Sequence, residues 1–297
     1  MDVSTPRQVG KSAMRVTPLG FGGGIMSRLE VSNEQATATV KAAWDSGVRF
    51  YETSPWYGVG RSERRLGLAL FGAKGAGTSP PRDSYCINTK VGRTLIPEPV
   101  LDETKKTLSP NGQLRTHRDP HSGFRVDFGY SYERIMAQHW DSLQRLGHSR
   151  VDSLTLHDID YGYHSPEQID SYMTQLSKTG GGGARALEEL RDSGAISAIG
   201  CGCNLESRNA FSWEDSAHED LCMRIADTVD LDFLSWLARI RYWKPERCVA
   251  FCPCVRNAIS ASSLPPLTQV VGWCHLMRPR PICMTRRRMT LFRNHGA

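Results

Sequence analysis

The last 51 residues of the chain, 247–297, contain no aspartate, no glutamate and no lysine. They hold eight arginines and five of the nine cysteines. The whole chain carries +6 and this segment alone +8, which leaves −2 for residues 1–246. This change of composition predicts two parts, a first region of residues 1–240 and a basic, Cys- and Arg-rich tail of residues 241–297.

Other features are also missing. No apolar run reaches the ~18 residues that a transmembrane helix needs, and residues 1–10 hold no apolar stretch of the signal-peptide type. The cysteines show neither disulfide-framework spacing nor paired CxxC motifs. We therefore expect a cytoplasmic protein that has no membrane partner and keeps its cysteines reduced.

Residues 1–240 alternate between strand and helix patterns. The expected strands cover residues 17–22, 48–52, 84–91, 151–157, 196–204 and 231–237. The expected helices cover residues 33–46, 62–71, 131–146, 183–193 and 221–228. Repeated β–α units imply parallel strands with right-handed crossovers. Six units in about 240 residues suit a (β/α)8 TIM barrel better than a Rossmann sheet, which would place a glycine fingerprint after its first strand.

Two expected connections are long, residues 92–130 and 159–182. Both follow strands, so they lie at the carboxyl end of the barrel, where such folds build their substrate sites. The second ends in Gly180–Gly183. We interpret this run as a hinge or linker rather than a phosphate cradle, because no Lys-Ser/Thr pair accompanies it.

Polar side chains mark the expected strand ends. Glu52, Lys90, His157 and Asn204 each close an apolar run, and Tyr57 follows Glu52 in a turn. Taken singly, a terminal lysine is usually solvated and a lone histidine is usually structural. Consecutive strand ends of a barrel converge on one pocket, however, so an acid, a phenol, an amine and an imidazole would meet there.

This set of groups suits proton transfer to or from a substrate oxygen. A free tyrosine has a pKa of about 10, and an adjacent ammonium lowers it by favouring the phenolate. A carboxylate holds the lysine in place, and an imidazole can orient a carbonyl or alcohol oxygen. A cofactor would then carry the hydride.

Long segments of the chain resemble the aldo-keto reductases, in particular their sugar- and pyridoxal-oxidising branch. The resemblance covers roughly residues 15–240 and rests on LGFGGG (19–24), TSPWYGVGRSERRLGLAL (53–70), NTKVGR (88–93), DSLQRLGHSRVDSLTLHD (141–158) and GARALEELRDSGAISAIG (183–200). It implies an NADP- or NAD-dependent oxidoreductase acting on a sugar hemiacetal or another small aldehyde or alcohol.

The same resemblance assigns roles to individual residues. Tyr57 would be the proton donor and acceptor, Lys90 would tune it, and His157 would orient the substrate. Asn204 would contact the nicotinamide carboxamide, and Gly22, Gly23 and Gly24 would approach the nicotinamide ribose.

The chain departs from the family at three places. Glu52 stands where the family has aspartate, and its extra methylene would move the carboxylate or the ammonium of Lys90 out of register. Cys203 replaces a small or hydroxyl residue, a change that should be tolerated. After Arg239 the likeness ends, so we expect a barrel that is incomplete after its sixth strand and lacks the family's loop for the adenosine phosphate.

A frameshift would explain the tail. Codons compatible with the residues after 239, read two nucleotides out of frame, permit a family-like seventh strand. The coding nucleotide sequence tests this hypothesis, because the absence of such an open frame would contradict it.

Other functions of the tail fit its sequence less well. Arginines 286–288 could form a patch for nucleic acid or anionic membrane, but such patches usually contain lysine. A zinc site fits no common spacing; the residues considered for it are Cys248, Cys252, Cys254, Cys274 and His275. We expect no metal and no nucleic-acid partner. The alternative to an active oxidoreductase is a catalytically inactive remnant or a non-catalytic binding protein.

Overall fold

The computed structural model describes residues 5–72, 80–97, 118–119, 123–161, 164–203, 215–236 and 272–275. Asn204 and all of the predicted tail except residues 272–275 lie outside the described residues. The two-part division of the chain, the assignment of Asn204 and the frameshift hypothesis therefore stay predictions.

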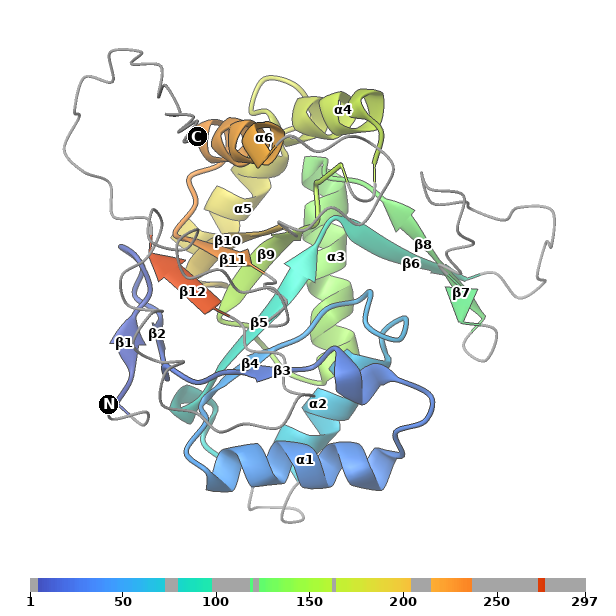
Figure 1. Cartoon of the computed structure of the whole chain (residues 1–297), viewed down its shortest axis with the longest axis vertical. Coiled ribbons are helices and arrows are strands. Elements are labelled where there is room, and N and C mark those ends of the chain that lie inside the picture. The colour runs from blue at the N-terminus through green and yellow to red at the C-terminus, as the bar shows by residue number, and fades with distance from the viewer. Residues whose placement is uncertain are drawn as a thin grey trace, which may run out of the picture.

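A curled sheet of parallel strands forms the centre of the molecule (Figure 1). The six parallel strands, in spatial order, are β3 (Phe21–Gly22), β4 (Phe50–Glu52), β5 (Cys86–Val91), β9 (Ser153–His157), β10 (Ala198–Cys203) and β11 (Phe233–Trp236). Their order in space is their order along the chain, as in a barrel that winds in one direction. The predicted α/β fold of TIM-barrel type is confirmed for its first six strands, whereas the predicted incompleteness concerns residues 237–271 and 276–297, which lie outside the described residues.

Helices connect these strands and cover the outer face of the sheet. They are α1 (Asn33–Asp45), α2 (Arg61–Gly72), α3 (Tyr132–Leu146), α5 (Gly183–Asp192) and α6 (Asp215–Thr228). All five were predicted, although α6 begins earlier than its apolar pattern indicated. A capping box between Ser32 and Gln35 starts α1, and Gly147 ends α3 in the left-handed conformation.

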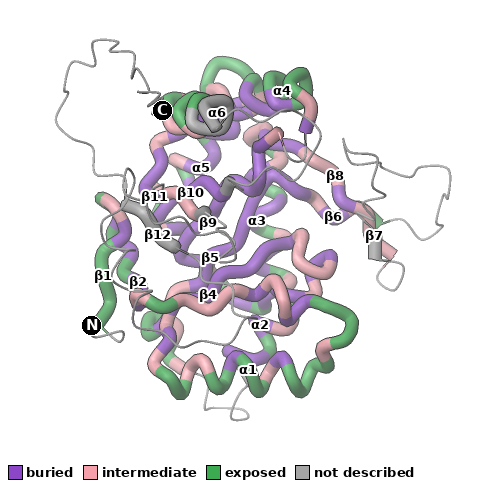
Figure 2. Tube along the Cα trace, in the orientation of Figure 1, coloured by how far each residue is buried: buried purple, intermediate pink, exposed green. Residues whose placement is uncertain are grey.

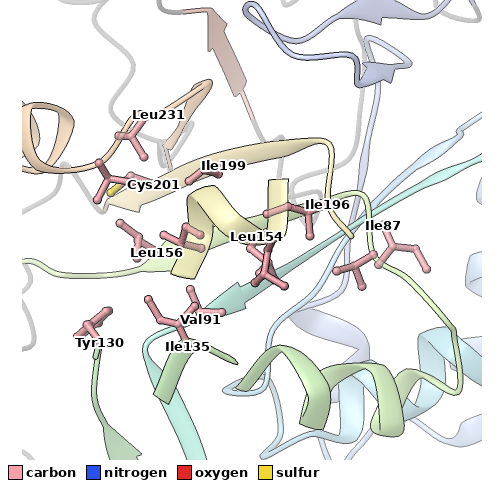
Figure 3. Packing of buried hydrophobic residues seen from close by; sticks show 14 of the residues in the cluster. Ile87, Val91, Tyr130, Ile135, Leu154, Leu156, Ile196, Ile199, Cys201 and Leu231 are labelled. Carbon is pink, nitrogen blue, oxygen red and sulfur yellow. The ribbon is translucent and has the colours of Figure 1, made fainter. Parts of the chain in front are cut away.

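The core lies between the sheet and the helices. Strand residues Ile87, Leu154 and Leu156 are fully buried and belong to one core cluster with Ile135 of α3, which lies beside Val91 (Figures 2 and 3). Helices α2 and α3 approach closely at Gly67, where a Cβ would lie 1.9 Å from the carbonyl oxygen of Leu146. Only glycine fits this contact, which gives the central glycine of the RRLGLAL segment a packing role.

The first long connection contains a hairpin that the sequence did not predict. β6 (Arg93–Pro97) pairs with β8 (Phe124–Phe128), which also pairs with β7 (Arg118–Asp119), all antiparallel. Leu95 and Val126 face each other in register and are buried against Val59. The alternation of apolar and polar residues in these strands is short and lies among prolines and polar residues. It therefore did not predict a hairpin.

The second long connection contains helix α4 (Pro166–Leu176), which was also not predicted. Its start signals are present in the sequence, since Ser165 forms a capping box with Gln168 and proline occupies the first turn. The glycine run then packs tightly against α4 and α3. Gly182 adopts φ +73°, and a Cβ on Gly183 would lie 2.0 Å from the Tyr130 carbonyl oxygen. The run forms a tight turn from α4 into α5, and its predicted role as a hinge or linker stays a prediction.

An N-terminal hairpin, β1 (Arg7–Gln8) with β2 (Arg15–Val16), covers the amino ends of the sheet strands. Its apolar residues Val9 and Met14 pack against Phe50 and Phe233, the first residues of β4 and β11. This hairpin does not cover the carboxyl ends of the strands, where barrel enzymes place their active sites.

One segment of the predicted tail joins the sheet. Strand β12 (Gly272–His275) pairs with β11, and the pairing is antiparallel. A continuing barrel would add a parallel strand at this edge. Among the described residues, no helix is both long and apolar enough to cross a membrane, and no group of three or more His, Cys, Asp or Glu side chains is arranged to hold a metal ion.

Candidate active site

Four of the predicted side chains meet at the carboxyl ends of neighbouring strands. Glu52 ends β4, Lys90 lies near the end of β5 and His157 ends β9, while Tyr57 reaches them from the turn after β4. Glu52, Lys90 and His157 are buried, and Tyr57 is half-buried. The parallel register makes this possible, because Glu52 pairs with Asn88 and Lys90 pairs with Thr155.

The Tyr57 hydroxyl lies between a cation and an anion. Lys90 Nζ donates to Tyr57 Oη at 2.9 Å, and Tyr57 Oη donates to Glu52 Oε1 at 3.1 Å. Lys90 Nζ also donates to the Thr53 carbonyl oxygen at 3.1 Å and forms an ion pair with Glu52. Glu52 thus pairs with Lys90 and also contacts the phenol, and the expected shift of its carboxylate or of the ammonium out of register stays a prediction.

The turn that presents Tyr57 is unusual in its backbone. Gly58, Val59 and Gly60 all have positive φ, at +61°, +51° and +82°. Positive φ is rare and costly for a β-branched residue such as valine. The Val59 side chain is buried with Leu95 and Val126 of the hairpin, and this packing holds the turn against its strain.

Burial shifts the titration of two site residues. The pKa of Lys90 falls to about 7 because its ammonium is buried; the Asp158 carboxylate opposes the shift and Arg93 adds to it. The pKa of His157 lies well below its usual value, first because of burial and then because of the Arg93 and Lys90 charges. The imidazole of His157 is therefore neutral at pH 7.

His157 is held on several sides. Its Nδ1 lies 2.9 Å from Ser54 Oγ, and its backbone carbonyl accepts a hydrogen bond from Tyr130 Oη at 3.0 Å. The rings of His157 and Tyr57 meet edge to face, with their centroids 5.8 Å apart. The imidazole and the phenol thus lie beside one another, as joint contact with one substrate oxygen requires.

The glycines predicted to meet the cofactor lie next to this cluster. Gly22 is in register with Glu52, and the Gly23 amide donates to the Glu52 carbonyl oxygen at 2.7 Å. A Cβ on Gly23 would lie 2.6 Å from Ser62 Oγ. The close packing of this segment against β4 and α2 therefore requires glycine at position 23, independently of any contact with the cofactor.

Sequence reasoning missed two charged residues of the site. Arg93 and Asp158 form a buried ion pair beside His157, with Arg93 Nη2 at 3.1 Å from Asp158 Oδ2. Both lie within quoted family segments, NTKVGR and LTLHD, and each follows a strand-end group by only one to three residues. A charged residue directly after a buried strand was the available signal.

Comparison with known proteins agrees with this geometry. The sequence model described as "Aldo/keto reductase family" matches residues 18–215. Pyridoxal 4-dehydrogenase from Microbacterium luteolum is 36% identical over 208 residues, which cover 69% of this chain and 57% of that protein. D-threo-aldose 1-dehydrogenase from Pseudomonas sp. is 31% identical over 260 residues, covering 86% of this chain and 67% of that protein.

A solved structure shares the fold at lower identity. The aldo-keto reductase AKR11C1 from Bacillus halodurans, in its holo form, superposes with a TM-score of 0.53 at 19% identity, covering 91% of this chain and 74% of that one. In sequence, the chain spans 57% of the length of the pyridoxal 4-dehydrogenase that it matches. On the family model and these relatives, the chain belongs to the aldo/keto reductase family.

Proposed function

We propose that this protein is an NAD- or NADP-dependent oxidoreductase that interconverts a small neutral sugar hemiacetal, alcohol or aldehyde with its oxidised or reduced partner. The observation that carries the proposal is the 2.9 Å hydrogen bond from Lys90 Nζ to the half-buried Tyr57 hydroxyl. Two relatives are named for the oxidation of pyridoxal and of D-threo-aldose, and this supports a small carbonyl or alcohol substrate.

The charge balance of the site favours a neutral substrate. The charged groups near Tyr57 form two ion pairs. Lys90 pairs with Glu52, and Arg93 pairs with Asp158. Within the described residues this cluster has no excess positive charge for an anionic substrate. A hydroxylated, uncharged molecule such as an aldose meets hydrogen-bonding groups without a charge mismatch.

Each side chain has a defined task in the oxidation direction. Tyr57 takes the proton of the substrate hydroxyl, and the adjacent Lys90 ammonium stabilises the phenolate that accepts it. His157, being neutral, donates an N–H to the substrate oxygen and orients it. In the reduction direction the proton moves from Tyr57 back to that oxygen.

A bound nicotinamide would supply or accept the hydride. The backbone of Gly22–Gly24 would hold it, since this segment runs directly beside Glu52 at the end of β4. Asn204 would add an amide contact, as predicted from the sequence.

Cofactor binding tests the proposal. Titration of the full chain with NADH and NADPH, followed by nicotinamide fluorescence, should give a saturable change for at least one of them. The Tyr57→Phe variant should bind equally well, because its hydroxyl acts on the substrate proton. No saturable change with either cofactor would contradict the proposal.

The alternative is a catalytically inactive remnant of the family. The antiparallel pairing of β12 on β11 favours it, because a continuing barrel of the family would add a parallel strand at this edge. A folded chain that binds neither cofactor would support this alternative.

A further inference from the structure

Asp158 adopts a backbone conformation that non-glycine residues rarely take. Its φ is +47°, directly after the last residue of β9, and its amide donates to the Gly202 carbonyl oxygen at 3.0 Å. Aspartate tolerates the left-handed region better than most residues, but the conformation still has a cost. The surrounding structure must therefore hold Asp158 there.

Arg93 supplies part of that hold. Its side chain is 1% exposed, and its guanidinium lies 4.4 Å from the Trp56 ring centroid and 5.3 Å from that of Phe128. Cation–π contacts on two rings fix its plane. From this position Arg93 Nη2 reaches Asp158 Oδ2 at 3.1 Å, so the carboxylate is held in one orientation.

The same carboxylate oxygen faces His157. Asp158 Oδ2 lies 3.3 Å from His157 Nε2, on the side of the ring opposite Ser54. The serine hydroxyl alone cannot determine the tautomer, because it can either donate to Nδ1 or accept from it. The contact is electrostatic rather than a hydrogen bond, and the negative charge beside Nε2 favours the neutral tautomer that carries its hydrogen on that nitrogen.

We propose that the Arg93–Asp158 ion pair fixes His157 as its Nε2–H tautomer, which makes Asp158 a positioning residue for the imidazole. Ser54 Oγ accepts from the Trp56 amide at 3.1 Å and gives its own hydrogen to Nδ1. Both ring nitrogens then have a defined state, which agrees with the neutral imidazole that burial favours.

The length of the Asp158 contact bears on the reaction. At 3.3 Å it is longer than the 2.7–2.9 Å of strong charge-assisted hydrogen bonds. The Nε2–H is therefore oriented without being fully engaged, and it can donate to a substrate oxygen beside Tyr57. This catalytic meaning rests on the proposed function, whereas the tautomer itself does not.

The test reads the tautomer directly. Two-dimensional ¹H–¹⁵N spectra of the full chain labelled with ¹⁵N-histidine give the protonation of each ring nitrogen, and His157→Gln assigns the His157 signals. In the wild type we expect Nε2 protonated and Nδ1 bare. In Asp158→Gly, which keeps the positive φ without strain, the ratio of Nε2–H to Nδ1–H should fall roughly tenfold, because the negative charge beside Nε2 is removed.

Two further variants separate the proposal from a general effect on folding. Asp158→Asn removes the negative charge and tolerates the same φ, so it should lower the ratio as Asp158→Gly does. Asp230→Asn removes a carboxylate that pairs with Arg191 away from the site, and it should change nothing at His157. A wild-type His157 protonated at Nδ1, or an unchanged ratio in Asp158→Gly, would overturn the proposal.

The outcome is independent of turnover. A wild-type chain with the Nε2–H tautomer and no activity would contradict the proposed function and uphold this assignment. An active chain with the Nδ1–H tautomer would support the proposed function and contradict the tautomer assignment.

Discussion

The Tyr57 hydroxyl donates to Glu52 Oε1 at 3.1 Å, so the carboxylate at the end of β4 contacts the phenol as well as the lysine. The two contacts have opposite effects on the proposed chemistry. The Lys90 ammonium favours the phenolate, whereas a carboxylate that accepts the phenolic hydrogen favours the neutral phenol. On the proposed function, we therefore expect glutamate, in place of the aspartate that the family resemblance implies, to weaken the activation of Tyr57 by Lys90.

Shortening this side chain should reverse the effect. In Glu52→Asp we expect the carboxylate to withdraw from Tyr57 Oη and keep its ion pair with Lys90. Losing one such hydrogen bond, about 1 kcal/mol, should move the acidic limb of the oxidation rate to lower pH by roughly one unit. The measurement is the pH profile of kcat, with Glu188→Asp, whose partner is the remote Lys178, as the matched control. An unchanged profile would mean that the Glu52–Tyr57 contact has no influence on the phenol.

His157 should make stability depend on pH below neutrality. Its pKa in the folded state is lowered well below 6.5, so the unfolded chain binds a proton at mildly acidic pH that the folded chain does not. The free energy of unfolding should therefore fall as pH drops below about 6.5, by up to about 1.4 kcal/mol per pH unit.

Comparison with a variant isolates this contribution. Urea unfolding of wild type and His157→Gln should show a difference that is constant above pH 7 and shifts in favour of the variant at lower pH. The other buried histidines with lowered pKa values, His139 and His148, are present in both proteins and cancel. A difference that stays constant from pH 7 to pH 5 would mean that His157 protonates equally in both states.

The turn after β4 should be sensitive to a single methyl group. In Gly58→Ala the new Cβ would lie 2.6 Å from the Ser27 carbonyl oxygen at φ +61°. We expect the free energy of unfolding to fall by about 1–3 kcal/mol because of overpacking, in addition to the cost of a positive φ for alanine. Because Tyr57 precedes this residue, a displacement of ~1 Å should lower kcat by up to about a hundredfold.

Gly147→Ala is the matched control for this substitution. Gly147 has nearly the same φ, +65°, but nothing within 4 Å of its Cβ position, and it ends α3 away from the site. Gly147→Ala should lower the free energy of unfolding by about 1 kcal/mol, because alanine disfavours a positive φ, and it should leave kcat unchanged. Equal effects of the two substitutions on kcat would show that the turn does not position Tyr57.

The sequence predicted the sheet order because periodic apolar patterns carry that information. Each β–α unit has a strand run such as Leu154–Leu156 and a helix with its own start or stop signal, such as Gly147. The hairpin with Leu95 and Val126 was not predicted, because strands β6 and β8 are short and lie far apart in the sequence. Their pairing depends on tertiary packing against Val59, which no local pattern reports.

The sequence predicted the types of residue in the site and the contacts of Lys90 with Tyr57 and with Glu52, but not the contact of Glu52 with Tyr57 or the role of Asp158. Strand-end positions brought Glu52, Lys90 and His157 together, because the ends of parallel strands meet at one edge. The contact of Glu52 with Tyr57 depends on one methylene and a strained turn. The role of Asp158 depends on a positive φ that residue type alone does not reveal.

Substrate-dependent reduction of the nicotinamide is the most direct measurement of the central claim. The full chain is mixed with NAD⁺ or NADP⁺ and a panel of neutral aldoses, with phosphorylated aldoses and sugar acids for comparison, and the absorbance of the reduced nicotinamide is followed. We expect turnover with at least one neutral aldose and little with the anionic analogues. In Tyr57→Phe, which removes the proton-transfer hydroxyl, kcat should fall by at least about a hundredfold. A wild-type rate no higher than that of Tyr57→Phe, measured on chain shown to bind the cofactor, would contradict the central claim.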